Sequence, residues 1–215
     1  MQKGFTPTPE SRYGSDGASH NRDLVWGFTL VELLVVIAIV AVLSMLVILT
    51  LNPAELLKQS RDSNRISDMS TLKSAVSLYL SDATTPVLVP GGAYDTCHMS
   101  VTPETPLCGV FSQFGAITQA TGTVVQFVDG GGWLPVGFVQ ISSGAPFGNL
   151  PIDPMNNANF YYAYAAVSSS LVFEIDASGM ESVKYGVNGD SDAVSADGGD
   201  NPTALEVGNA PSLSL

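Results

Sequence analysis

An apolar block dominates the first quarter of the chain. Between residues 33 and 51 only Ser44 and Thr50 are polar. As a helix, the apolar stretch 28–51 would extend about 36 Å, and the hydrocarbon core of a bilayer is about 30 Å thick. The block is longer than the core of a secretory signal peptide, and no small-x-small cleavage site follows it. The pattern therefore predicts a retained transmembrane helix.

An amphipathic helix is predicted after this block. The run Asn52-Pro53-Ala54-Glu55 is a helix-start signal, since Asn suits the cap, Pro suits the first helical position, and Glu can bond back to the cap. The backbone is therefore expected to kink or restart there, and the helix to reach Asp82. Spacings of three and four predict a buried stripe of Ile66, Met69, Leu72 or Lys73, Val76 and Leu80. The other faces are assigned to polar residues: Gln59, Arg61, Asp62, Asn64, Ser67 and Asp68.

The rest of the chain reads as a loop-rich β region, which makes the fold class α+β. Glycine and proline are absent from 28–52 and frequent from Pro86 to Asn159. β-branched and aromatic runs predict strands at 123–128 and 136–141, and a hairpin of 160–167 with 171–175. Tyr161, Tyr162 and Tyr164 are interpreted as sheet packing rather than as a sugar-binding platform.

The charge distribution excludes several classes of function. The chain has 20 acids and 8 bases, for a net charge of −12. From residue 74 onward the only base is Lys184, so no basic patch exists there and no nucleic-acid binding is expected. The two histidines, His20 and His98, are too few for a multi-histidine metal site. No nucleotide-binding loop or nucleophile elbow is found, so no enzyme activity, catalytic residue or cofactor is assigned.

The two cysteines, Cys97 and Cys108, enclose a ten-residue segment. A disulfide between them would stabilise the fold by about 2–3 kcal/mol. A zinc site is disfavoured, because Cys97, His98 and Cys108 supply three ligands at best. The pair implies an oxidising location, so the β region is expected outside the cytoplasm.

An acidic stretch near the C-terminus begins like an EF-hand, with Asn188, Asp190 and Asp192 at the first three positions. The Gly and Glu expected later are replaced by Ala193 and Gly199, which excludes an EF-hand. Two interpretations stay open, a solvated acidic loop and a looser calcium site formed by Asp190, Asp192, Asp197 and Asp200.

The run Gly27-Phe28-Thr29-Leu30-Val31-Glu32 resembles the prepilin cleavage and N-methylation motif of type IV pilins and type II secretion pseudopilins. The resemblance implies that a prepilin peptidase cuts between Gly27 and Phe28 and methylates the new amine of Phe28. It also implies that Glu32 pairs with the N-terminal amine of a neighbouring subunit. The leader differs from the short basic leaders of the family, because it holds three bases and three acids.

The resemblance also implies an architecture and a function. The fold would be pilin-like, with a long N-terminal helix packed on an antiparallel sheet, and the function would be that of a filament subunit. Partners would be prepilin peptidase, other copies of the chain, an assembly ATPase, an inner-membrane platform protein and the membrane. Major pseudopilins also carry a calcium loop similar to 188–200 in composition and place. The expected divisions are a leader 1–27, a transmembrane and filament-core helix 28–51, an amphipathic helix 52–82 and an extracytoplasmic β domain 83–215.

Two questions stay open at this point. One is whether the filament is a pilus or a secretion pseudopilus. The other is whether the chain is instead a membrane-anchored enzyme or a sugar-binding ectodomain with an uncleaved anchor.

The orientation in the membrane is argued from two sides. Arg12 and Arg22 precede the helix, whereas Lys58, Arg61 and Arg65 follow it, so the positive-inside rule favours a cytoplasmic C-terminal side. The cysteine pair and the resemblance favour the opposite orientation, and we give them more weight. The chain is expected to be a single-pass protein of the inner membrane with its C-terminal domain outside, and later part of an extracellular or periplasmic filament.

Overall fold

The computed structural model describes residues 27–90, 96–102, 111, 119–209 and 215. The chain divides into two compact units, one ending at Val47 and the other beginning at Ile48. The leader up to residue 26 and Cys108 lie outside the described residues.

Two helices follow one another along the chain, α1 from Leu30 to Leu51 and α2 from Pro53 to Asp82. Asn52 separates them with a left-handed backbone, φ 42°, and its side chain accepts a hydrogen bond from the Glu55 amide. The predicted helix restart at Asn52-Pro53 is therefore confirmed. Asparagine suits this position, since it tolerates the left-handed region better than most residues.

Within the described residues, the sheet has five strands in the order β2-β1-β3-β4-β5. The hairpin of β3 and β4 is antiparallel, and β1 and β5 add to it on either side in antiparallel register. The sheet is not antiparallel throughout, because β2 pairs with β1 in parallel. The strand bounds are Thr96–Met99 for β1, Gln119–Gly122 for β2, Tyr162–Val167 for β3, Val172–Ala177 for β4 and Leu205–Gly208 for β5.

The predicted hairpin is confirmed by β3 and β4, but the predicted strands 123–128 and 136–141 are wrong. The second of these segments contains a short 3-10 helix, η3, at Phe138–Gln140. Its apolar residues Val136, Phe138 and Ile141 are buried in the core without joining the sheet. The apolar residues of this segment indicated that it is buried, not that it forms a strand. β-branched and aromatic residues are buried in irregular segments as well as in strands.

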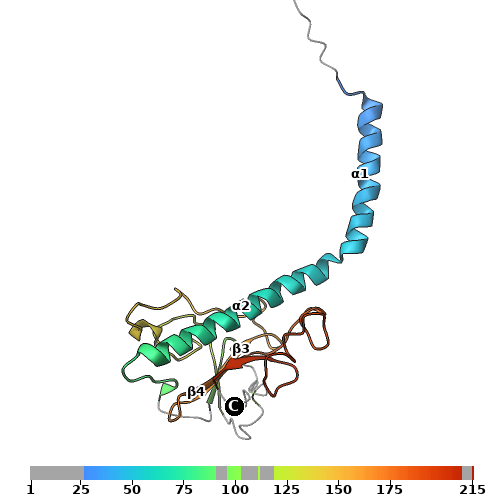
Figure 1. The fold of residues 1–215 in the computed structure, drawn as a ribbon. Helices are drawn as coiled ribbons and strands as arrows, with labels where there is room; N and C mark the ends of the chain where they lie inside the picture. The colour runs from blue at the N-terminus through green and yellow to red at the C-terminus, as the bar shows by residue number, and fades with distance from the viewer. Residues whose placement is uncertain (1–26, 91–95, 103–110, 112–118, 210–214) are drawn as a thin grey trace, which may run out of the picture. The chain divides into compact units, whose positions relative to one another are not determined.

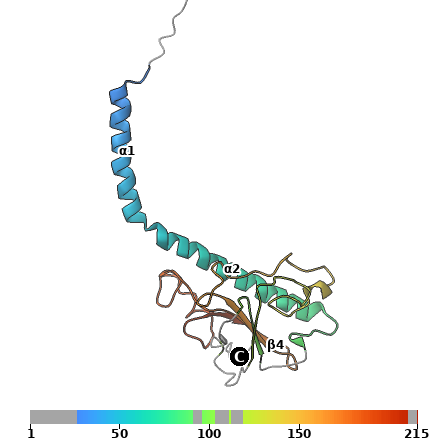
Figure 2. The same cartoon turned by 180° about the vertical axis from the view of Figure 1, so that it is seen from behind.

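Helix α2 packs on one face of the sheet (Figure 1, Figure 2). Met69, Leu72 and Val76 are fully buried, so the predicted stripe is confirmed, and Leu72 rather than Lys73 belongs to it. Alternation along β3 sends Tyr162 and Tyr164 into this core, whereas Ala163 and Ala165 join a second apolar cluster on the other face. The residues 161, 162 and 164 are all buried, which confirms their interpretation as sheet packing.

Candidate functional site

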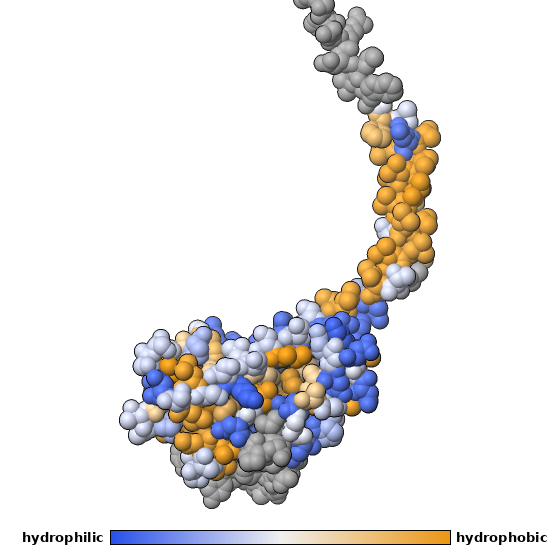
Figure 3. Space-filling model, in the orientation of Figure 1, coloured by the Kyte–Doolittle hydropathy of each residue, from blue (hydrophilic) through white to orange (hydrophobic). Residues whose placement is uncertain are grey.

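Helix α1 carries a continuous exposed apolar surface (Figure 3). Its segment Leu30–Ile48 is long and apolar enough to cross a membrane, and none of it is buried within the chain. The large apolar side chains described from Phe28 to Leu51 are 48–79% exposed. The hydroxyl of Ser44 donates to the Val40 carbonyl oxygen at 2.7 Å, so it is satisfied inside the helix. A surface of this kind needs a cover of lipid or protein.

The residues of the predicted cleavage site precede this helix. Gly27 and Phe28 are exposed and non-helical. Among the described residues, no atom beyond the immediate chain neighbours lies within 4 Å of the position that a Cβ on Gly27 would take. The peptide bond between them is therefore accessible in this unit. Thr29 ends the segment and caps the helix, because its Oγ1 accepts a hydrogen bond from the Glu32 amide at 3.1 Å.

Glu32 lies in the first turn of α1 and is exposed. A carboxylate at a helix N-terminus is favourable, because the unpaired amides of the first turn carry partial positive charge. Thr29 and Glu32 also have the spacing of a capping box, in which Glu or Gln bonds back to the cap residue. Glu32 therefore has a local reason to be present, besides the pairing that the prepilin resemblance implies. The sequence analysis did not identify Thr29 as the cap of this helix.

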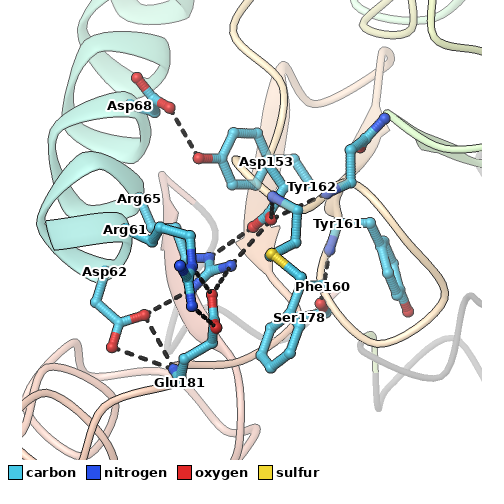
Figure 4. A network of polar contacts seen from close by, with 12 residues as sticks. Arg61, Asp62, Arg65, Asp68, Asp153, Phe160, Tyr161, Tyr162, Ser178 and Glu181 are labelled. Carbon is cyan, nitrogen blue, oxygen red and sulfur yellow. Dashed lines mark hydrogen bonds and ion pairs between the residues drawn. The ribbon is translucent and has the colours of Figure 1, made fainter. Parts of the chain in front are cut away.

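A buried ion network joins α2 to the rest of its unit (Figure 4). The fully buried Arg65 donates from Nε and Nη2 to both carboxylate oxygens of Asp153, at 2.6 and 3.0 Å. Its Nη1 donates to Asp62 Oδ1 at 2.6 Å. The Asp62 carboxylate also accepts from the backbone amides of Glu181 and Ser182. The prediction that Asp62 lies on a polar face is wrong, because these donors replace water around its carboxylate.

Glu181 extends this network to the helix surface. Arg61 Nε donates to Glu181 Oε1 at 2.8 Å, and Arg65 Nη2 lies 2.8 Å from the same oxygen. Hydrogen bonds from Arg61 and then Arg65 hold the pKa of Glu181 below its usual value. For Arg65, burial alone would lower the pKa, and the hydrogen bonds of Asp153, Glu181 and Asp62 raise it overall, so the guanidinium stays charged.

The helical spacing of Asp62 and Arg65 could have identified this network from the sequence. Residues 62, 65, 69, 72 and 76 follow one another at spacings of three and four, so Asp62 and Arg65 continue the buried stripe towards the helix N-terminus. On the same helix, Asp68 accepts a hydrogen bond from the Tyr162 hydroxyl at 2.8 Å, and burial raises its pKa.

Cys97 is buried on β1 and is not a free thiol. Because Cys108 lies outside the described residues, the pairing of the two cysteines stays a prediction. The neighbouring His98 packs beside Tyr164, with 6.3 Å between ring centroids, and burial lowers its pKa to about 4. This histidine is therefore neutral at physiological pH.

Two of the four aspartates of the predicted calcium site, Asp192 and Asp197, organise the backbone around them. Asp192 accepts hydrogen bonds from three amides, those of residues 188, 194 and 195. Asp197 accepts from the amides of Gly199 and Glu206, whereas Asp190 and Asp200 are exposed. In the described part of the chain, these four carboxylates are not brought together into a cluster that could hold an ion.

No family model matches the chain, and no match is found among curated proteins or among solved structures. Support for a function therefore comes from the motif at 27–32 and from the geometry described above.

Proposed function

We propose that the chain is a structural subunit of a filament of the type IV pilus or type II secretion pseudopilus kind, and that α1 is its polymerising element. The observation that carries this proposal is the 22-residue helix α1, which is apolar on all sides and has Glu32 as its only charge. In the membrane, lipid chains cover this surface. After extraction it is stable only when buried against other copies, because apolar surface in water is unfavourable.

The processing step follows from the same segment. Cleavage by prepilin peptidase between Gly27 and Phe28 leaves a methylated ammonium at the start of the mature chain. Glu32 of one subunit then pairs with that ammonium on its neighbour, since two buried opposite charges need each other in an apolar surrounding. The accessible bond after Gly27 supports this step. Extraction from the membrane is powered by an assembly ATPase acting through an inner-membrane platform protein.

Residues 52–215, the part of the second unit that follows α1, are extracytoplasmic in this proposal. All three bases of the charge count after the membrane helix make ion pairs inside this unit, Lys58 with Glu55, and Arg61 and Arg65 in the buried network. The folded structure therefore explains why these bases are present. This reduces the weight of the positive-inside argument for a cytoplasmic location. The cysteine pair supports the extracytoplasmic side.

Mass spectrometry of the mature N-terminus tests this proposal. Membranes of cells that express the full chain together with its prepilin peptidase should yield N-methyl-phenylalanine at Phe28 and no residue of the leader. A Gly27→Val variant is the matched control. Its branched side chain crowds the scissile bond, so it should retain the leader.

Two results would contradict the proposal. An intact Met1 would favour an anchored enzyme or a sugar-binding ectodomain with an uncleaved anchor. A cut beyond Leu51 would mean that the apolar block is a signal peptide.

A further inference from the structure

Strands β4 and β5 place three carboxylates side by side on one face of the sheet. Asp176 stands directly opposite Glu206 in the antiparallel register. Glu174 lies two residues before Asp176, so both side chains point to the same face. The alternate residues Phe173 and Ile175 point to the core beneath α2.

This acidic face is closed to solvent. Glu174 and Asp176 are 0% exposed, and Glu206 is 1% exposed. Their partners across β3 are Ala165 for Glu174 and Ala163 for Asp176, small residues that leave room for the carboxylates. One oxygen from each of the three acids lies within 4.8 Å of the others. Like charges this close on adjacent strands destabilise a sheet.

In the part of the chain that the structure describes, several oxygens of the cluster have no hydrogen-bond partner outside the three acids. No such donor reaches either oxygen of Asp176, Oε1 of Glu174 or Oε1 of Glu206. The other oxygens are held by the backbone, since Glu174 Oε2 accepts from the Leu215 amide and Glu206 Oε2 from the Asn201 amide, each at 2.9 Å. In the described chain, none of the ion pairs involves these acids. The cluster therefore has the free oxygens of a site that lacks its positive partner.

We propose that Glu174, Asp176 and Glu206 bind one calcium ion between β4 and β5. Carboxylate oxygens are the ligands that Ca²⁺ prefers, at about 2.3–2.6 Å, so ligands on opposite sides of the ion lie about 5 Å apart or less. The spread of the three oxygens fits this size. Mg²⁺ retains several water molecules in most protein sites, and a closed cluster has little room for them.

In this proposal, the acidic stretch 188–200 supports the strand site by positioning Glu206, and does not bind the ion itself. A Cβ on Gly199 would collide with the carboxylate of Glu206, so a glycine is needed where the chain passes the cluster. Asp197 accepts the Glu206 amide at 2.8 Å and fixes the beginning of β5. The bound ion joins β4, β5 and the Leu215 amide into one unit. This inference does not depend on the proposed filament function.

Calcium titration of the full chain in detergent micelles tests the site. The protein is stripped with EDTA and titrated with CaCl₂ at neutral pH, by calorimetry and by thermal unfolding. One ion should bind per chain, and Tm should rise by about 5–10 °C at a free Ca²⁺ concentration near 100 Kd. MgCl₂ at the same concentration should give a smaller shift, and an equal shift would overturn the assignment to calcium.

Two variants separate the strand site from the acidic loop. Asp176→Asn removes a ligand charge from the crowded cluster, so in EDTA its Tm should equal or exceed that of the unmutated protein, and the calcium shift should be lost. Glu206→Gln should behave in the same way and replaces Asp176→Asn if that variant does not fold. The matched control is Asp190→Asn with Asp192→Asn, which should keep the shift.

Either of two results would overturn the proposal. One is the absence of any calcium effect on the unmutated protein, which would mean that protons rather than a cation neutralise the cluster. The other is loss of calcium binding in the Asp190→Asn, Asp192→Asn control while Asp176→Asn retains it. Neither result bears on cleavage after Gly27, which the mass spectrum reports separately.

Discussion

At the scale of single residues, two charges stand in surroundings that would ordinarily exclude them. Glu32 is the only charge of the apolar helix α1, and Arg65 lies fully buried on the sheet-facing side of α2. Arg65 has its carboxylate partners within its own chain. Glu32 has no ion pair in the described chain, and the filament proposal gives it one from a neighbouring subunit.

The role of Glu32 can be separated from helix capping by two substitutions. Glu32→Ala should be inserted and cleaved normally, and should lower filament yield more than about tenfold, because a buried ammonium without its partner costs about 3–5 kcal/mol. Glu32→Gln can still complete a capping box but carries no charge. It should fail as severely as the alanine variant in a sheared-filament assay. Normal filament yield from Glu32→Gln would show that capping alone explains the residue.

Acid should weaken the fold through Glu181. Its pKa is lowered in the folded state by Arg61 and Arg65, so folding favours the charged form. The resulting stability is complete above the unfolded pKa, about 4.3, and is lost as the pH falls through the folded pKa. Urea unfolding between about pH 6 and pH 3 should therefore show a shallower loss for Glu181→Gln than for the unmutated chain. Parallel curves would contradict this assignment, since all other carboxylates are common to both proteins.

At the scale of elements, α2 is held to its unit by an apolar stripe and by a buried ion network. The network connects the helix to the segment around Asp153 and to the segment around Glu181, which lie far from it in sequence. Buried ion pairs add little stability compared with apolar contacts, but breaking one by removing a single partner is costly.

Arg65→Met should destabilise the unit by about 3–5 kcal/mol, because it leaves Asp62 and Asp153 buried without their cation. Lys73→Met on the same helix is the control. Its side chain is exposed, so the change in the free energy of unfolding should stay within about 0.5 kcal/mol. Urea denaturation of both variants in micelles measures the difference. Equal changes in the free energy of unfolding for the two variants would mean that the Arg65 network adds no more stability than an exposed lysine does.

A disulfide between Cys97 on β1 and Cys108 is predicted from the sequence. Exported protein is unfolded in guanidinium and alkylated with iodoacetamide, once without and once with prior reduction. Unfolding is needed because burial alone would protect Cys97. Two thiols should react only after reduction. Labelling of both without reductant would place the β region in a reducing compartment and contradict the disulfide.

At the scale of the whole molecule, the open question is which side of the membrane carries residues 52–215, the part of the second unit that follows α1. Before assembly, protease added to spheroplasts should degrade this unit and leave the N-terminal side protected. Cytoplasmic marker proteins must survive in the same sample as the control for membrane integrity. A fragment of the unit that persists until the membrane is lysed would show that the positive-inside count gives the true orientation.

Local patterns determined several features without knowledge of the fold. The apolar helix, the restart at Asn52-Pro53 and the hairpin of β3 and β4 each depend on neighbours a few residues apart. Hydrophobic period, cap chemistry and turn residues encode such features directly.

The tertiary structure alone decided which polar groups are buried together. Arg65 meets Asp153 across 88 residues of sequence, and Asp176 meets Glu206 only because β5 pairs with β4 in one register. The runs at 123–128 and 136–141 looked like strands, although neither joins the sheet. Val136, Phe138 and Ile141 of the second run fill the core from an irregular backbone, whereas Val124 and Phe127 of the first are exposed. The physical reason is that burial and charge pairing depend on which distant segments cover a residue, and no local pattern carries that information.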